Sequence, residues 1–265
     1  MKTKIFLFLI ATAMLVFISC SNPNEPNDIE DPMYPTTIYC LSEEILLKKR
    51  NDFAHRNPDI ATSLNQFGFC ASVNVLYGGP TKSGNFTEEE AIAAVKQFVD
   101  INPEYTGISN SNDLKFRGAV SSTSGYNDAL FWYLGTENQI IKGIEVAYSG
   151  IMFHTKDRSL IWCNGNHFPD VYIPKKFNFN IERTKSQLLG KEIIHYGWTT
   201  YSAGFVTPER LQQSITKLII IPVTTDEKIE LRVCWQIYLE APLHYIFEID
   251  VMTGEIISEA PTIVF

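Results

Sequence analysis

The 265-residue sequence contains none of the short motifs that mark an active site. Its five histidines never occur as His-Glu-x-x-His, the helical pattern that places two imidazoles and a general base around zinc. Gly-x-Ser-x-Gly, the strained turn that carries a hydrolase nucleophile, is absent, and so is a phosphate-binding glycine loop. These absences predict a protein without catalytic residues, without a cofactor and without a metal ion.

Positive charge is also scarce. The chain has 22 Lys and Arg against 30 Asp and Glu, which gives a formal net charge of −8. Nucleic acid is bound through clusters of Lys and Arg, so this balance argues against a nucleic-acid partner. The nearest approach to a metal site is Cys163 with His167, and it lacks two further ligands at usable spacing. We interpret this pair as a strand cysteine followed by a turn histidine.

The apolar run near the start, Ile5 to Ile18, is shorter than the ~20 residues that a membrane-spanning helix needs. It follows Lys2 and Lys4 and ends just before Cys20, a pattern that resembles bacterial lipoprotein signal peptides. The resemblance implies that residues 1–19 are removed, that the Cys20 thiol accepts diacylglycerol, and that the chain is lipid-anchored in the cell envelope. It leaves the leaflet open. The alternative is an ordinary signal peptide with an incidental cysteine.

Residues 20–35 are rich in proline, asparagine and acidic side chains, and they show no apolar periodicity. Such a segment buries too little apolar surface to offset the entropy lost when a chain is ordered. We therefore expect a disordered acidic tether between the lipid anchor and the folded part of the chain.

Four cysteines remain after Cys20, and they allow three pairings in an oxidising compartment. Cys163 and Cys234 lie in apolar, strand-like runs, where cysteine often acts as a small buried side chain. Buried free thiols and disulfide bridges both remain open. The bridge to test first is Cys40–Cys70, because both residues lie in the N-terminal segment.

Apolar periodicity and end signals predict three helices among many strands. Ser42 is an N-cap, Thr87 with Glu90 forms a capping box, and Asn102 before a proline ends the second helix. The predicted helices cover residues 42–54, 87–101 and 181–195. The predicted strands cover residues 69–77, 113–120, 128–135, 144–154, 159–164, 217–223, 231–240, 244–251 and 255–258. A hairpin turn is expected from Asp250 to Gly254.

One arrangement, a helix followed by an antiparallel meander, occurs twice along this series. A helix laid across such a sheet is an α+β layer architecture. We therefore predict two consecutive α+β units, residues 36–173 and residues 174–265, joined by a linker at 169–174.

Segments of both units resemble parts of metalloprotease precursors. In the first unit, the stretches that resemble the fungalysin/thermolysin propeptide are Phe86–Ile108 and Ile140–Pro169, with Gly143-Ile144-Glu145-Val146 and the turn Asn164-Gly165-Asn166 inside the second. The second unit is similar to PepSY domains from Ile181 onward, with HYIFEIDVMTGEIIS at 244–258 as its last hairpin. One departure is Asp157-Arg158, which stands where a glycine is common.

The resemblance implies a function. In that family the propeptide assists the folding of its enzyme and inhibits it until cleavage, and free-standing PepSY modules are thought to regulate extracellular proteases. No protease domain is expected after Phe265, so the resemblance implies action in trans. We hypothesise a non-enzymatic lipoprotein that binds a secreted or envelope peptidase and inhibits it or chaperones it.

The aromatic residues support a different hypothesis. The chain has 17 Phe, 12 Tyr and 4 Trp, and Trp132 and Trp198 lie in local aromatic clusters. Exposed Trp and Tyr suit a protein interface or a sugar-stacking surface, so both tryptophans are candidate interface residues of a surface lipoprotein that captures glycans or nutrients. Core packing is the simpler interpretation of both. A third hypothesis is a hydrolase whose nucleophile and base meet only in the fold.

Overall fold

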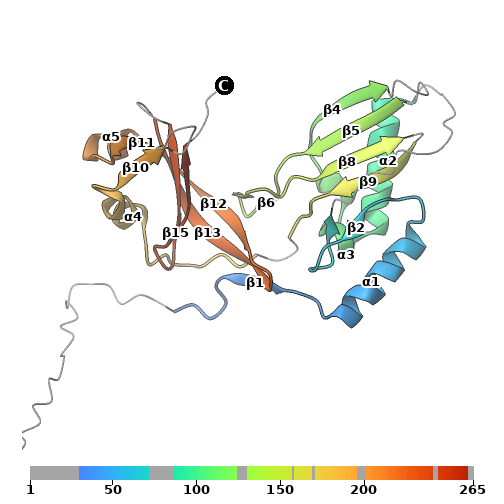
Figure 1. Ribbon diagram of the computed structural model, residues 1–265, viewed down its shortest axis with the longest axis horizontal. Coiled ribbons are helices and arrows are strands. Elements are labelled where there is room, and N and C mark those ends of the chain that lie inside the picture. Colours follow the sequence, from blue (N-terminus) through green and yellow to red (C-terminus); the bar gives the residue numbers. More distant parts are fainter. Residues whose placement is uncertain are drawn as a thin grey trace, which may run out of the picture.

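The computed structural model describes residues 30–71, 86–123, 130–156, 158–168, 171–195, 201–240 and 244–261. In these ranges the chain forms a four-stranded sheet, a seven-stranded sheet and two small two-stranded sheets, with helices beside them (Figure 1). The α+β prediction is confirmed. No helix of the described residues is both long enough and apolar enough to cross a membrane.

The four-stranded sheet is antiparallel and covered by one helix. Its strands, in spatial order, are β4 (Phe116–Thr123), β5 (Leu130–Thr136), β8 (Met152–Lys156) and β9 (Ser159–Asn164). Helix α2 (Glu88–Ile101) lies across one face (Figure 1). The predicted capping box is present, because Thr87 accepts from the Glu90 amide and Glu90 accepts from the Thr87 amide. Between helix and sheet lies an apolar core that includes Val95, Leu134 and Phe153.

The remaining small elements flank this unit. They are α1 (Glu43–Arg56), the hairpin of β2 (Ser63–Leu64) and β3 (Cys70–Ala71), α3 (Pro103–Thr106) and the 3-10 turn η1 (Ser111–Asp113). Ser42 caps α1, as predicted. The chain before β2 runs along the outer edge of β9, where the Ala61 amide donates to the Ile161 carbonyl at 3.0 Å. One edge of the four-stranded sheet is therefore covered.

The seven-stranded sheet is built mainly from the C-terminal half. Its strands are β15 (Ile256–Pro261), β14 (Tyr245–Asp250), β13 (Lys228–Leu239), β12 (Ile215–Thr224), β7 (Ile144–Val146) and β6 (Ile140–Ile141), with β1 (Thr36–Tyr39) paired to β13. On one face pack α4 (Ile181–Leu188), α5 (Pro208–Gln213) and the hairpin of β10 (Glu192–His195) and β11 (Tyr201–Phe205). Leu188, Leu211 and Phe247 belong to the core between them.

The two predicted units share a sheet. Strands β1, β6 and β7 come from residues 36–173 but belong to the seven-stranded sheet, and β7 pairs in parallel with β12. The predicted strand 144–154 is therefore wrong, because it is divided between the two sheets. The division falls at Tyr148, which has a φ of 58°, and at Ser149, whose hydroxyl donates to the Val146 carbonyl at 2.7 Å. A left-handed residue breaks a strand, so the chain leaves one sheet and enters the other.

The predicted helix 181–195 is also wrong in its second half. Helix α4 ends at Leu188, and Gly190 adopts a φ of 77° and donates its amide to the Val206 carbonyl. The following residues form β10, which places Ile193 in the core. β-Branched residues favour strands, and here they end the helix where its apolar spacing alone predicted continuation. Of the predicted strand 69–77, Cys70–Ala71 is a strand and residues 72–77 lie outside the described residues.

Candidate functional site

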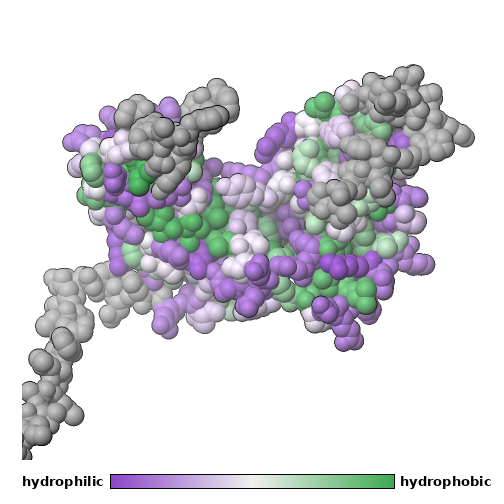
Figure 2. Space-filling model, in the orientation of Figure 1, coloured by the Kyte–Doolittle hydropathy of each residue, from purple (hydrophilic) through white to green (hydrophobic). Residues whose placement is uncertain are grey.

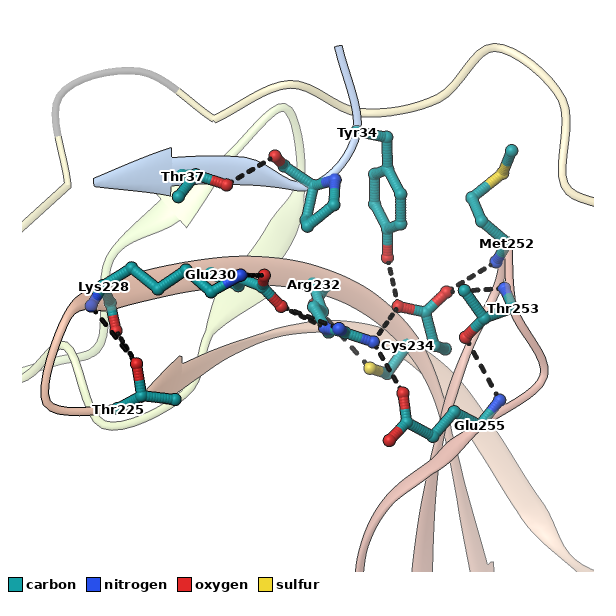
Figure 3. A network of polar contacts seen from close by, with 12 residues as sticks. Tyr34, Thr37, Thr225, Lys228, Glu230, Arg232, Cys234, Met252, Thr253 and Glu255 are labelled. Carbon is teal, nitrogen blue, oxygen red and sulfur yellow. Dashed lines mark hydrogen bonds and ion pairs between the residues drawn. The ribbon is translucent and has the colours of Figure 1, made fainter. Parts of the chain in front are cut away.

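The densest polar cluster lies where two strands meet end to end against β13. β1 pairs with the first residues of β13 and β14 pairs with the last, which leaves Arg232 and Val233 between them. The Tyr34 side chain fills this gap, since its hydroxyl accepts from the Val233 amide at 2.9 Å. The same hydroxyl donates to Asp250 Oδ2 at 2.8 Å (Figure 3). A phenol thus continues the hydrogen bonding that a strand would otherwise provide.

Asp250 is fully buried and uses both carboxylate oxygens. Oδ1 accepts from the amides of Met252 at 2.7 Å and Thr253 at 2.9 Å, and Oδ2 faces Tyr34 and Arg232. The predicted turn is confirmed, because Gly254 has a φ of 71°. A side chain at Gly254 would also meet the Phe179 ring at 2.4 Å, so glycine is required there for two reasons.

Arg232 connects this carboxylate to the surface. Its guanidinium contacts Glu230 Oε2 at 2.7 Å, Glu255 Oε2 at 2.9 Å and Asp250 Oδ2 at 3.5 Å, and Glu230 is also paired with Lys228 (Figure 3). Three carboxylates therefore face two cations. Hydrogen bonding from Lys228 holds the pKa of Glu230 below its ordinary value, with Arg232 acting in the same direction.

The Asp250 cluster joins Tyr34 to the turn after β14 through hydrogen bonds. Burial raises the pKa of Tyr34 far above the ordinary value, and the neighbouring Asp250 carboxylate raises it further, so the phenol stays protonated and donates. Both oxygens of Asp250 have partners within the chain, so this carboxylate joins Tyr34 to the turn that follows β14. An adjoining cavity of about 640 Å³ is lined by Asp31, Tyr34, Arg232 and Met252 among others.

A second cavity, of about 700 Å³, lies at the end of the four-stranded unit. Asp113, Lys115, Glu137 and His167 are among its lining residues. The His167 side chain is 9% exposed, and its Nε2 has no hydrogen-bond partner. Burial lowers the pKa of His167 to about 4, although Asp113 opposes this, so the imidazole is neutral at neutral pH. Within the described residues, no group of three His, Cys, Asp or Glu side chains is arranged to hold a metal ion.

The structure places one of the three candidate residues from the sequence. Trp132 is half-buried on β5, and its indole N–H donates to the Phe86 carbonyl at 3.0 Å while the ring packs against the core. Trp198 and the lipidation residue Cys20 lie outside the described residues. The interface role of both tryptophans therefore stays a prediction, and Trp132 is already engaged within its own unit.

The Cys40–Cys70 bridge, the pairing to test first, is not formed in this structure, in which all four described cysteines are free. The Cys40 thiol donates to the Asp226 carbonyl at 2.9 Å, next to the β12–β13 turn, while Cys70 is buried in the core beneath α2. Proximity in sequence was misleading, because β1 carries Cys40 away to the other sheet. Cys163 and Cys234 are buried free thiols, one of the two alternatives that the sequence left open.

The edges of the sheets differ in how they are protected. The β15 edge carries Pro261 and an ion pair between Glu259 and Lys191 at 3.1 Å, both of which discourage pairing with another strand. The outer edge of β4 has no pairing strand among the residues that the structure describes. From Gly118 to Thr123 this edge has no charged residue and no proline, and Val120 is 66% exposed. β4 is therefore a surface on which an extended segment can add.

Apolar side chains also gather over the seven-stranded sheet between the two lobes (Figure 2). On the face opposite α4, a small cluster is formed by Ala147, Ile219, Ile221 and Cys234, with Val223 and Ile257 beside it. All of these residues come from strands or from the end of β7. The four cluster residues are at most 6% exposed, so they leave little apolar surface free for a partner.

Comparisons with known proteins give little. No family model matches the sequence, and no curated protein is similar enough to count as a match. Among solved structures, the chain is similar to the Bacillus megaterium YpeB C-terminal domain, with 13% sequence identity, over 85% of this chain and 99% of that chain, at a TM-score of 0.31. A TM-score this low carries no argument about fold or function, so both are argued from the chain itself.

Proposed function

We propose that this chain is a non-enzymatic, lipid-anchored envelope protein that binds a peptidase in trans and regulates it. The similarity of Phe86–Ile108 and Ile140–Pro169 to metalloprotease propeptides supports the class of partner. The observation that carries the mode of binding is the outer edge of β4, along which none of the described residues forms a pairing strand. The Cys20 leader supports the location, because a lipid anchor holds the module beside envelope and secreted enzymes.

Strand addition suits a regulator that has no chemistry of its own. Main-chain amides and carbonyls along β4 supply affinity to an extended partner segment, and the alternating side chains supply specificity. Val120 is the large exposed apolar side chain on β4, and Gly118, which lies on the same face of the strand, adds no side chain beside it. The partner segment is therefore an extended stretch of the peptidase with a small apolar residue opposite Val120.

The test is a measurement of peptidase activity. The purified chain is added to envelope and secreted fractions of the source organism, and cleavage of an unstructured protein substrate is followed. The matched variants are Val120→Glu, on the β4 edge, and Leu47→Glu, at a residue on α1 that is 60% exposed. We expect the unchanged chain and Leu47→Glu to alter the rate, and Val120→Glu to need roughly tenfold more protein, because a charge at an edge opposes pairing.

Two results would count against the proposal. One is a chain that neither changes peptidase activity nor crosslinks to a peptidase in those fractions. The other is an equal effect of both variants, which would retain the partner class and reject the β4 edge. Glycan binding that is lost in Trp132→Ala or Trp198→Ala would instead favour the glycan-capture hypothesis. Cys20→Ala tests the anchor separately, and it is expected to abolish labelling by a fatty-acid analogue.

A further inference from the structure

The core of the four-stranded unit contains two thiols that the proposed function does not use. Cys70 on β3 is 2% exposed, and Cys163 on β9 is 0% exposed. Both belong to the same apolar cluster beneath α2, although 93 positions separate them in the sequence. Because each is a potential nucleophile held away from water, their mutual position decides what chemistry they can undergo.

Local hydrogen bonding brings the two strands together. The Thr62 hydroxyl donates to the Cys163 carbonyl at 3.0 Å and accepts from the Cys163 amide at 2.8 Å, which fixes the chain before β2 against β9. The β2–β3 hairpin then turns back, with Leu64 opposite Cys70, and packs against β9. Because β3 packs against β9 in this arrangement, Cys70 and Cys163 are neighbours within one apolar core.

The other two described cysteines have different surroundings. Cys40 contacts the Asp226 carbonyl beside the turn that follows β12, and Cys234 lies in a separate cluster on the seven-stranded sheet. Neither belongs to the cluster beneath α2. The geometry therefore singles out one pair among the thiols that the structure describes.

We propose that Cys70 and Cys163 are the disulfide-forming pair of this chain, oxidised by thiol–disulfide exchange with a disulfide-bearing oxidant as the chain folds. One S–S bond forms between the two sulfurs and the S–S bond of the oxidant breaks. The two cysteines lose two electrons and two protons in total, and the oxidant leaves as two thiols. An exported chain meets such an oxidant in the compartment that the Cys20 leader implies.

The timing of the reaction follows from burial. In the closed core, burial raises the pKa of the Cys163 thiol, so the attacking thiolate is scarce and the oxidant has no access. Exchange therefore precedes closure of the core or uses an opening of the β2–β3 hairpin, whose strands have two residues each. The bond closes a loop that contains α2, β4, β5 and β8, and so restricts most of this unit in the unfolded chain.

Peptide mapping by mass spectrometry tests the proposal directly. The full chain is refolded from the reduced, denatured state in a buffer of oxidised and reduced glutathione, and it is digested without reduction. We expect one peptide that joins Cys70 to Cys163, with Cys40 and Cys234 unpaired. We also expect Tm to fall by roughly 10 °C on reduction, because the closed loop is long. Four free thiols, or a bridge that includes Cys40, would overturn the proposal.

Variants separate this bond from other effects of reduction. The Tm difference between oxidised and reduced protein is compared within each variant, so any loss of packing cancels. Cys70→Ala is expected to abolish the difference, while Cys40→Ser and Cys234→Ala keep it. A difference that persists in Cys70→Ala would reject the pair. Should Cys70→Ala fail to fold, mapping of the unchanged chain still decides between the pairings.

Discussion

The two sheets use opposite means to bury polar groups. The four-stranded sheet and α2 enclose an apolar core, and the buried His154 on β8 is a neutral imidazole whose pKa burial lowers to about 4. The seven-stranded sheet buries a carboxylate, Asp250, and satisfies it with Tyr34, Arg232 and two amides. One region avoids charge by deprotonation, and the other keeps its charge by pairing it.

The two regions are therefore sensitive to different changes. A neutral buried histidine destabilises the fold only when acid protonates it. A paired buried carboxylate destabilises the fold when one of its partners is removed. The first region should therefore respond to mild acid, and the second to substitution within the Asp250 cluster.

The largest effect is expected from Asp250→Ala. The substitution leaves the Met252 and Thr253 amides, the Tyr34 hydroxyl and Arg232 without their shared acceptor. Two of these residues, Met252 and Tyr34, belong to the core or pack against it. We expect the free energy of unfolding to fall by about 3–5 kcal/mol, because breaking a buried charge pair leaves the other groups uncompensated. Urea unfolding of the purified chain measures it.

Asp250→Asn is the matched control. It keeps an oxygen for the turn amides and removes the charge that faces Arg232, so we expect a loss between those of the unchanged chain and Asp250→Ala. Equal stability of Asp250→Ala and the unchanged chain would show that the Asp250 cluster does not stabilise the fold. The proposed difference between the two sheets would then be wrong.

The parts of this site that sequence could predict are those made by neighbouring residues. The Asp250–Gly254 turn was expected, since an aspartate and a glycine at that spacing satisfy and permit the turn locally. Tyr34 was not, because it contacts Val233 across 199 positions. A weak signal for Arg232 did exist. Lys, Glu and Arg alternate with apolar residues from 228 to 232, which puts three charges on one face of a strand.

The fold divides in the same way. The helices capped by Ser42 and Thr87, and the strand at 159–164, form as predicted because their signals are local. The prediction of a strand at 144–154 was wrong because its two halves pair in different sheets. The first half, β7, pairs in parallel with β12, and the second half, β8, pairs with β5. Apolar spacing indicates which residues are buried, and it does not indicate which sheet buries them.

The acid response is the second prediction. The pKa of His154 and that of His167 are about 4 in the folded chain, against 6.5 when unfolded. Between these values the unfolded chain binds more protons than the folded chain, so stability is lost as pH falls from 6.5 to 4. Each histidine accounts for up to about 3 kcal/mol. Urea midpoints measured across this range report the loss.

Substitution separates this acid response from that of the charged cluster. Glu230 has a lowered pKa, so its contribution is present above 4.5 and is lost as pH falls further, which overlaps only the acid end of the histidine window. His154→Leu removes the titratable imidazole, which packs against the rings of Phe131 and Tyr133. We expect a shallower slope of stability between pH 6.5 and 4 in this variant. An unchanged slope would mean that His154 is not the neutral buried group described above.

A smaller effect is expected from Tyr34→Phe. The variant keeps the ring and removes the hydroxyl that bonds the Val233 amide and Asp250. We expect a loss of about 1–3 kcal/mol, because a buried amide and a carboxylate each lose one partner. In a double-mutant cycle with Asp250→Ala, the two losses should be less than additive, since both remove the same bond. Fully additive losses of unfolding free energy would mean that the Tyr34 hydroxyl and Asp250 stabilise the fold independently.

The smallest effect is expected from Thr87→Ala, which tests whether the four-stranded unit depends on charge at its surface. Thr87 and Glu90 satisfy each other's amides at the start of α2, and Glu90 also forms an exposed ion pair with Arg158 at 2.7 Å. Loss of the N-cap should cost about 1 kcal/mol, measured by urea unfolding. Added salt should leave that cost nearly unchanged, because the cap bonds a neutral hydroxyl to an amide, whereas exposed ion pairs are screened. If the loss of unfolding free energy in Thr87→Ala disappears in added salt, charge also stabilises the four-stranded unit. That unit would then differ less from the seven-stranded sheet with its Asp250 cluster.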